Sequence, residues 1–315
     1  MKAISFIPGY INSLLSSFQA KSRNLFIIFA AEMKTKRQID IMGIVNLTDD
    51  SYFAQSRCQD PEAALSRIGM LLDEGADIID IGACSTRPGS KAVGADEEWK
   101  RLEPVLAAVA CRFPDITLSI DTYWSSVVQN AYDLIGDFIV NDISAGEDDP
   151  DMLKIVGKLG LQYVAMHKRG NPENMQYLTD YKDVTEDVIS YFRKFAVRAD
   201  DAGVRDWILD PGFGFAKTVD QNWQLLRDLG EILRFAQNDG SSQNDGSSQG
   251  GRKRRCLVGV SRKSMIYKPL GIAPEDSLPA TQGAHMLALM NGADILRVHD
   301  VKEARQVVTL FNMIA

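Results

Sequence analysis

Short apolar runs alternate with longer amphipathic stretches from about residue 39 to the C-terminus. The apolar runs are rich in β-branched residues and hold no regular alternation with polar positions. This pattern is typical of buried parallel strands, which are covered on both faces. The eight runs span residues 39–45, 78–81, 116–120, 138–140, 163–166, 207–209, 256–260 and 295–298.

The stretches between these runs have the periodicity of amphipathic helices. The first begins with Asp60 in the N-cap position and Pro61 at the first helical position. Several end at a glycine directly before the next strand, such as Gly75 and Gly203, and glycine commonly ends helices. The expected helices span residues 61–73, 97–110, 123–134, 152–159, 184–202, 221–235, 282–290 and 301–313.

Eight alternating strand–helix units predict an α/β fold, a (β/α)8 TIM barrel in a single domain. A doubly wound open sheet remains the alternative, because the number of strands does not by itself close a barrel. Such a sheet usually carries a GxGxxG motif after its first strand, and none is present there.

Two segments fall outside this pattern. Residues 1–36 are expected to form a poorly ordered N-terminal extension to a barrel of residues 37–315, with a signal peptide around the apolar run 25–31 as the alternative. Residues 237–255 contain QNDGSS twice and then Arg-Lys-Arg-Arg, which is low-complexity linker composition. We expect this insert, with a solvated basic end, on the face opposite the carboxyl ends of the strands.

Composition narrows the function classes. A chain of 315 residues with 45% hydrophobic content can bury a sizeable core, and its formal charge of −7 argues against a nucleic-acid partner. No apolar stretch approaches the roughly 20 residues that span a bilayer. Scattered cysteines without a CxxC motif fit reduced thiols in a cytoplasmic protein better than disulfides or a zinc site. They are Cys58, Cys84, Cys111 and Cys256.

Polar side chains follow every apolar run. In a barrel the carboxyl ends of all strands meet at one end, where the active sites of this fold lie. One such residue could merely cap a helix, but so many together indicate a site. They are Asn46, the loop 82–90, Asp121, Asn141, His167, Asp210, residues 261–263, and Arg297 with His299.

The chemistry of these residues divides in two. Asp121, Asn141 and Asp210 offer hydrogen-bond acceptors and an amide, which suit a flat heterocycle with N–H donors. A second set is cationic or polar and suits phosphate oxygens. It comprises Arg87, Lys263, Arg297, His299 and Asn46.

Two loops need separate interpretation. The stretch 210–218, DPGFGFAKT, ends like a phosphate-binding P-loop, but Pro211 and Ala216 stand where that motif requires glycines. It is therefore interpreted as a strand that ends on an acid and continues into a turn. The loop 82–90 holds small residues and is expected to be a mobile cover of the site.

Taken together, these segments resemble the dihydropteroate synthase family in order and spacing, from about residue 39 to the C-terminus. The STRPG segment and the pair SRKS and RVHDV are the most specific; the strands with carboxylates resemble pterin-binding methyltransferase domains as well. The matching segments are MGIVNLTDDSY (42–52), IDIGACSTRPGS (79–90), SIDTY (119–123), NDIS (141–144), MHKRG (166–170), DPGFGFAKT (210–218), GVSRKS (259–264) and ADILRVHDV (293–301).

The resemblance implies a reaction of folate biosynthesis in which p-aminobenzoate displaces diphosphate from 6-hydroxymethyl-7,8-dihydropterin diphosphate, with Mg²⁺ aiding the leaving group. It also implies a homodimer. By motif, the pterin would be bound by Asp121, Asn141, Asp210, Lys263, Met166 and Phe215. Diphosphate would be bound by Asn46, Thr86, Arg87, Arg297 and His299, with Asn46 also holding the metal. The p-aminobenzoate would lie beside Ser261, Arg262 and Pro88.

The chain departs from the family pattern in its first two loops. Asp49 replaces a proline and Tyr52 a phenylalanine in the first loop, and Ala83 and Cys84 stand where Gly-Glu is usual in the second. These changes bear on loop closure more than on the residues assigned to substrates. The alternatives are a methyltransferase-type pterin-binding module and a catalytically impaired paralogue.

Overall fold

The computed structural model describes residues 37–47, 61–84, 93–171, 174–237 and 254–314. The barrel lies in one compact unit, Ile39–Phe311. A second unit comprises residues 1–38 and 312–315, and only residues 37, 38 and 312–314 of it are described. Among the described residues, none of the helices is long and apolar enough to span a membrane.

Eight parallel strands form one sheet in the order β6-β5-β4-β3-β2-β1-β8-β7. A parallel bridge between Leu209 and Cys256 joins the two ends of this order, and the Leu209 amide donates to the Arg255 carbonyl at 2.9 Å. The sheet therefore nearly closes, which confirms the predicted barrel and rules out the open sheet. The strands are β1 Asp40–Asn46, β2 Ile78–Gly82, β3 Thr117–Asp121, β4 Ile139–Asp142, β5 Gln162–Met166, β6 Trp207–Asp210, β7 Leu257–Val258 and β8 Ile295–Val298.

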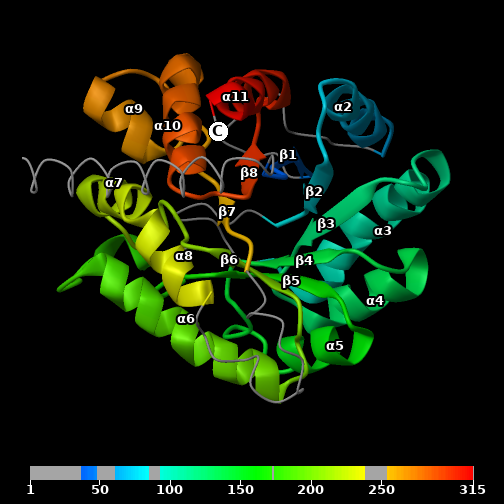
Figure 1. Ribbon diagram of the computed structural model, residues 1–315. Coiled ribbons are helices and arrows are strands. Elements are labelled where there is room, and N and C mark those ends of the chain that lie inside the picture. Colours follow the sequence, from blue (N-terminus) through cyan, green and yellow to red (C-terminus); the bar gives the residue numbers. More distant parts are fainter. Residues whose placement is uncertain (1–36, 48–60, 85–92, 172–173, 238–253, 315) are drawn as a thin grey trace, which may run out of the picture. The chain divides into compact units, whose positions relative to one another are not determined.

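Helices follow the strands and surround the sheet (Figure 1). Their buried apolar side chains pack against the outer faces of the strands in one large core. The helices are α2 Pro61–Asp73, α3 Ala95–Arg112, α4 Ser125–Ile135, α5 Met152–Leu159, α6 Val184–Asp201, α7 Val219–Arg227, α8 Leu229–Gln237, α9 Ser264–Leu270, α10 Leu278–Met290 and α11 Val301–Ile314, with short 3-10 turns η2 Met175–Tyr177 and η3 Pro274–Ser277.

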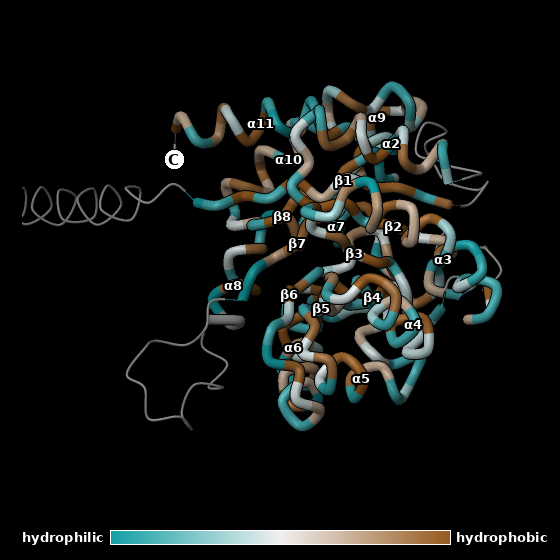
Figure 2. Tube along the Cα trace, turned by 90° about the vertical axis from the view of Figure 1, so that its right-hand side faces the viewer, coloured by the Kyte–Doolittle hydropathy of each residue, from teal (hydrophilic) through white to brown (hydrophobic). Residues whose placement is uncertain are grey.

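A second, smaller apolar cluster fills the inside of the barrel. Side chains alternate between the two faces of a strand, so every second residue points inward. Hydrophobic positions lie both on the strands and on the helices around them (Figure 2). The inner cluster takes one residue from each strand except β3: Met42, Ile78, Ile139, Val164, Ile208, Leu257 and Ile295.

The basic residues before β7 are part of the barrel. Arg254 is 9% exposed; its guanidinium lies 4.7 Å from the centroid of the Trp207 ring and donates to the Arg205 carbonyl at 2.8 Å. Arg255 forms an ion pair with Asp40 at 2.6 Å. The expectation of a solvated basic end is therefore wrong for Arg254, which is buried, whereas Arg255 is half-buried and held by Asp40 of β1.

Two helical regions differ from the sequence pattern. The single helix expected at 221–235 is two helices, α7 and α8, separated by Asp228 with φ −92° and ψ 9°. The carboxylate of Asp228 accepts from the Thr185 hydroxyl at 3.2 Å, a contact between segments far apart in sequence. Helix α9 was not expected, because it is only 7 residues long and contains Pro269.

Candidate active site

The polar residues of the site form the layer above the inner apolar cluster. Two positions after an inner apolar residue, the strands carry Asp80, Asn141, Met166, Asp210 and Arg297. The two-residue period of a strand keeps each of these side chains on the barrel interior. The strand ends thus place carboxylates, an amide and a guanidinium together at the carboxyl end of the barrel.

The register of the strands brings four of these ends to the same level. Asn46 of β1 is opposite Gly82 of β2, Gly82 is opposite Asp121 of β3, and Asp121 is opposite Asn141 of β4. A Cβ on Gly82 would lie 3.2 Å from the Cβ of Asp121. Glycine at this position therefore leaves room for the carboxylate.

Asp80 is the residue on which most polar contacts of the site converge. It is fully buried, and its carboxylate accepts from the Ser119 hydroxyl at 2.6 Å and from the Asn141 amide nitrogen at 3.2 Å. The Nε of Arg297 donates to the same carboxylate at 2.7 Å. Asp80 therefore orients the Asn141 side chain with its amide nitrogen toward the carboxylate, and it holds the Arg297 guanidinium in position.

Arg297 bridges two carboxylates. Its guanidinium pairs with Asp80 at 2.6 Å and with Asp121 at 2.8 Å. Burial raises the pKa of Asp121; Arg297 lowers it, while Asp80 raises it further. The ionised form of this carboxyl group therefore depends on the Arg297 guanidinium as its main counter-charge.

Asp210 and Lys263 form the second charged group. Asp210 is buried, and its carboxylate accepts from the Gly212 amide at 2.8 Å. Burial raises the pKa of Asp210, against the lowering effect of Lys263. The Lys263 ammonium donates to the Phe213 carbonyl at 2.6 Å and lies 5.0 Å from the Phe215 ring centroid. Burial lowers the pKa of Lys263 to about 8, and Asp210 opposes that shift.

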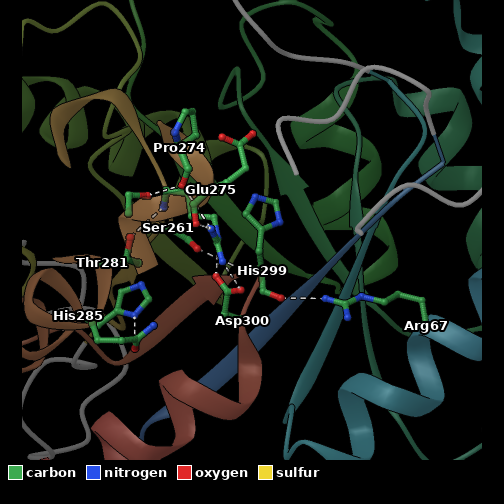
Figure 3. Close-up of polar contacts among 11 residues, drawn as sticks. Arg67, Ser261, Pro274, Glu275, Thr281, His285, His299 and Asp300 are labelled. Atoms are coloured by element: carbon green, nitrogen blue, oxygen red, sulfur yellow. Dashed lines mark hydrogen bonds and ion pairs between the residues drawn. The ribbon is translucent and has the colours of Figure 1, made fainter. Parts of the chain in front are cut away.

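The segments after β7 and β8 form a third group (Figure 3). The His299 amide donates to the Ser261 hydroxyl at 3.3 Å, and the His299 carbonyl accepts from Arg67 at 2.8 Å. Arg262 makes a bidentate ion pair with Asp300, with both N···O distances at 2.8 Å. Burial, followed by the charge of Arg297, lowers the pKa of His299 to about 3, so its imidazole is neutral at pH 7.

Some sequence-predicted residues lie apart from this centre or cannot be placed. The Arg262 guanidinium also donates to the carbonyls of Pro274 and Glu275, so it anchors the connection between α9 and α10. Cys84 lies 3.6 Å from the Tyr123 hydroxyl at the end of β2. The predicted Thr86, Arg87 and Pro88, the departures Asp49 and Tyr52, and most of the expected cover loop lie outside the described residues.

Sequence reasoning missed two buried charged residues next to the site. Asp80 stands between Ile79 and Ile81, and an acid inside an apolar run was the available signal. In the sequence, Lys217 stands out only as the lysine of an incomplete P-loop pattern, yet it is 5% exposed; burial lowers its pKa, and the nearby Asp210 opposes that shift. A lysine that is buried must find acceptors, and the glycine-rich loop before it supplies carbonyls.

The family model described as pterin binding enzyme matches residues 42–299. The chain belongs to the pterin-binding enzyme family. Within that family, it is 36% identical over 265 residues to the dihydropteroate synthase of Escherichia coli K12, covering 84% of this chain and 87% of the relative. These comparisons and the barrel agree with the resemblance read from the motifs.

Solved structures of this family have the same fold. The Yersinia pestis dihydropteroate synthase in complex with a sulfonamide drug is 35% identical with a TM-score of 0.78, covering 88% of this chain and 94% of that one. The Burkholderia cenocepacia dihydropteroate synthase complexed with 7,8-dihydropteroate is 34% identical with a TM-score of 0.74, covering 88% and 91%.

Proposed function

We propose that this pterin-binding enzyme family member is a dihydropteroate synthase. It condenses 6-hydroxymethyl-7,8-dihydropterin diphosphate with p-aminobenzoate to give 7,8-dihydropteroate and diphosphate. A C–N bond forms as the C–O bond to diphosphate breaks, and the attacking amine gives up one proton. The observation that carries the proposal is the gathering of Asp121, Asn141 and Asp210 with Arg297 and Lys263 at one end of the barrel.

The pterin ring is assigned to the carboxylate side of the site. A pterin presents an amino group and a ring N–H side by side, and one carboxylate can accept from both with charge-assisted bonds. Asp210 is suited to this role because, among the described residues, its carboxylate accepts one hydrogen bond, from the Gly212 amide. The full proposed set is Asp121, Asn141, Asp210, Lys263, Met166 and Phe215.

The leaving diphosphate is assigned to the part of the site beside Arg297 and His299, next to Asp121 of the pterin set. Preorganised cations stabilise charge that develops on a leaving group. Asn46 ends β1 half-buried, and an amide oxygen suits Mg²⁺, which commonly takes one or two protein ligands and completes its shell with phosphate oxygens and water. Bound there, Mg²⁺ would neutralise charge on the diphosphate. Thr86 and Arg87 complete the proposed set.

The p-aminobenzoate is assigned to Ser261, Arg262 and Pro88, as the family motifs imply; of these, Pro88 lies outside the described residues. Ser261 is 7% exposed and bonded to the backbone of His299, so it lies beside the proposed diphosphate position. This proximity supports the proposal, because displacement requires the attacking amine to reach the carbon that carries the leaving group.

The assembly and location complete the proposal. A homodimer is supported by large apolar side chains exposed on α10 and α11, namely Leu287 at 45%, Met290 at 62% and Leu310 at 56%. We place the protein in the cytoplasm on the evidence of its composition, and we propose that residues 1–36 and the insert before Arg254 take no part in catalysis.

Product formation by the purified full-length chain tests the proposal. We expect dihydropteroate and diphosphate in equal amounts when both substrates and Mg²⁺ are present, and neither dihydropteroate nor excess diphosphate when p-aminobenzoate is omitted. Pterin binding without product would identify a pterin-binding module instead. Product at a rate far below that of the Escherichia coli enzyme in the same assay would identify an impaired paralogue.

A further inference from the structure

Lys217 is a buried lysine that the proposed reaction does not use. It is 5% exposed, and its ammonium contacts the carbonyls of Gly212 at 2.9 Å and Phe215 at 3.0 Å. It also lies 2.9 Å from Nδ1 of His167. A fourth acceptor, the His167 carbonyl, lies 3.4 Å away. An ammonium has three N–H donors, and the three shorter contacts can use all of them.

The acceptors belong to two different loops. His167 directly follows β5, whereas Gly212 and Phe215 lie in the loop after β6. The β6 loop holds residues with positive φ at Gly212 (70°), Gly214 (84°) and Ala216 (51°), so it does not follow a regular helix or strand. A Cβ on Gly212 would overlap the His167 carbonyl, which shows how closely the loops approach. Lys217 is the side chain that ties them together.

The β6 loop also supports the proposed pterin side of the site. The Gly212 amide donates to Asp210 at 2.8 Å, and the Phe213 carbonyl accepts from Lys263 at 2.6 Å. Phe215 lies under the Lys263 ammonium. The path of this loop therefore sets the position of Asp210, of Lys263 and of the Phe215 ring together.

The charges fit this arrangement. Burial lowers the pKa of His167, and the neighbouring cations Lys217 and Arg169 lower it further. The imidazole is therefore neutral and Nδ1 can accept a hydrogen bond. Burial lowers the pKa of Lys217 to about 7, with Lys263 and Arg169 adding to that shift and Asp210 opposing it. Asp210 is thus the anion that favours the charged lysine.

We propose that Lys217 is a positioning residue for the pterin side of the site: it holds the β6 loop against neutral His167 and thereby fixes the direction of Asp210. The inference rests on the proposed function, since it assumes that Asp210 binds the ring. Lys217 acts through the loop and not by contact with the reacting atoms.

The test compares Lys217→Met with a matched control, Lys168→Met. Lys168 is also buried, at 6% exposure, but its ammonium pairs with Asp148 at 2.5 Å, and among the described residues it forms no hydrogen bond or ion pair with the β6 loop. Calorimetry on the full-length proteins measures binding of 6-hydroxymethylpterin and, separately, of inorganic diphosphate. For Lys217→Met we expect pterin affinity to fall about 30-fold with diphosphate affinity within about threefold of wild type; for Lys168→Met, both stay within about threefold.

Two variants of His167 keep the inference falsifiable if Lys217→Met does not fold. An asparagine side chain offers an acceptor oxygen at about the position of Nδ1, whereas leucine offers none. His167→Asn should retain pterin affinity within about fivefold, and His167→Leu should lose about 30-fold.

Three results separate the outcomes. Unchanged pterin affinity in folded Lys217→Met or His167→Leu overturns the inference. Parallel loss of both affinities together with a lower melting temperature also overturns it, because that identifies a general structural role. A wild-type protein that neither binds 6-hydroxymethylpterin nor forms dihydropteroate overturns the proposed function itself.

Discussion

At the scale of single residues, the site depends on carboxylates buried beside few cations. Arg297 is the partner of both Asp80 and Asp121, and the Asp80 side chain is 0% exposed. A buried carboxylate that loses its partner pays the full cost of desolvation. The geometry of the site and its stability therefore rest on the same guanidinium.

Replacement of Arg297 should show this double role. Arg297→Ala leaves two carboxylates without their main counter-charge, and we expect the free energy of unfolding to fall by about 3 kcal/mol at pH 8. Arg297→Lys retains the charge and should lose less than half as much. Urea denaturation measures both. Equal stability of Arg297→Ala and wild type would show that the two carboxylates do not depend on Arg297 as their counter-charge.

Glu98 gives a prediction about pH. It lies in the first turn of α3, is fully buried, and burial raises its pKa from 4.5 to about 7, with Asp121 raising it further and Thr122 lowering it. Because the folded-state pKa is the higher one, the stabilising contribution is present below the unfolded pKa and is lost as pH rises to about 7.

Glu98→Gln removes the group that must ionise. We expect this variant to melt higher than wild type at about pH 8.5, where wild-type Glu98 is ionised, and to match it at about pH 5. Differential scanning fluorimetry at the two pH values measures the difference. A change in melting temperature that is the same at both would contradict the assigned titration.

At the scale of elements, the packing between helices decides whether a helical glycine can be replaced, and helix propensity alone does not. Gly157 lies within α5, and a Cβ there would overlap the carbonyl oxygen of Ala202 at the end of α6. Gly69 lies within α2, and its nearest neighbour for a Cβ is a ring carbon of Phe113 at 3.8 Å. Both glycines lie within predicted helices, but only Gly69 has room for a Cβ atom.

Alanine at these two positions should have opposite effects. Gly157→Ala forces α5 and α6 apart and should destabilise the protein by about 1–3 kcal/mol. Gly69→Ala has room and should stabilise it by about 0.5–1 kcal/mol, because glycine costs entropy within a helix. Urea denaturation measures the free energy of unfolding of both variants. If that free energy changes in the same direction for both, the described packing of α5 on α6 is contradicted.

Elements also show where sequence patterns stop being informative. The strands were predicted because each is a compact apolar run, and Asp121, Asn141 and Asp210 were found because each ends or follows such a run. The break between α7 and α8 was missed, because it depends on Asp228 contacting Thr185 from another helix. The Arg262–Asp300 pair joins residues 38 positions apart and left no local signal either.

At the scale of the whole molecule, the number and spacing of strands predicted the barrel, but its closure required the structure. Closure depends on Leu209 of β6 contacting Arg255 and Cys256, which directly precede β7. These residues are far apart in the sequence, because the insert lies between the two strands. The contact between the Arg254 guanidinium and the Trp207 ring stabilises the pairing of β6 with β7, although Arg254 lies in a segment with linker composition. The composition of a segment does not reveal its tertiary contacts, and the closure of the barrel depends on those contacts.

The central claim is that the carboxylates at the strand ends bind a pterin for dihydropteroate synthesis, and Asp210→Asn tests it most directly. Asparagine keeps the shape but replaces one acceptor with a donor that faces the pterin's donors. We predict that kcat/KM for the pterin diphosphate falls by about 100-fold or more, about 3 kcal/mol. The melting temperature should stay unchanged or rise, because burial disfavours the ionised form of Asp210. A variant that unfolds more readily while keeping near-normal kcat/KM would show that Asp210 is a structural acid and would contradict the account.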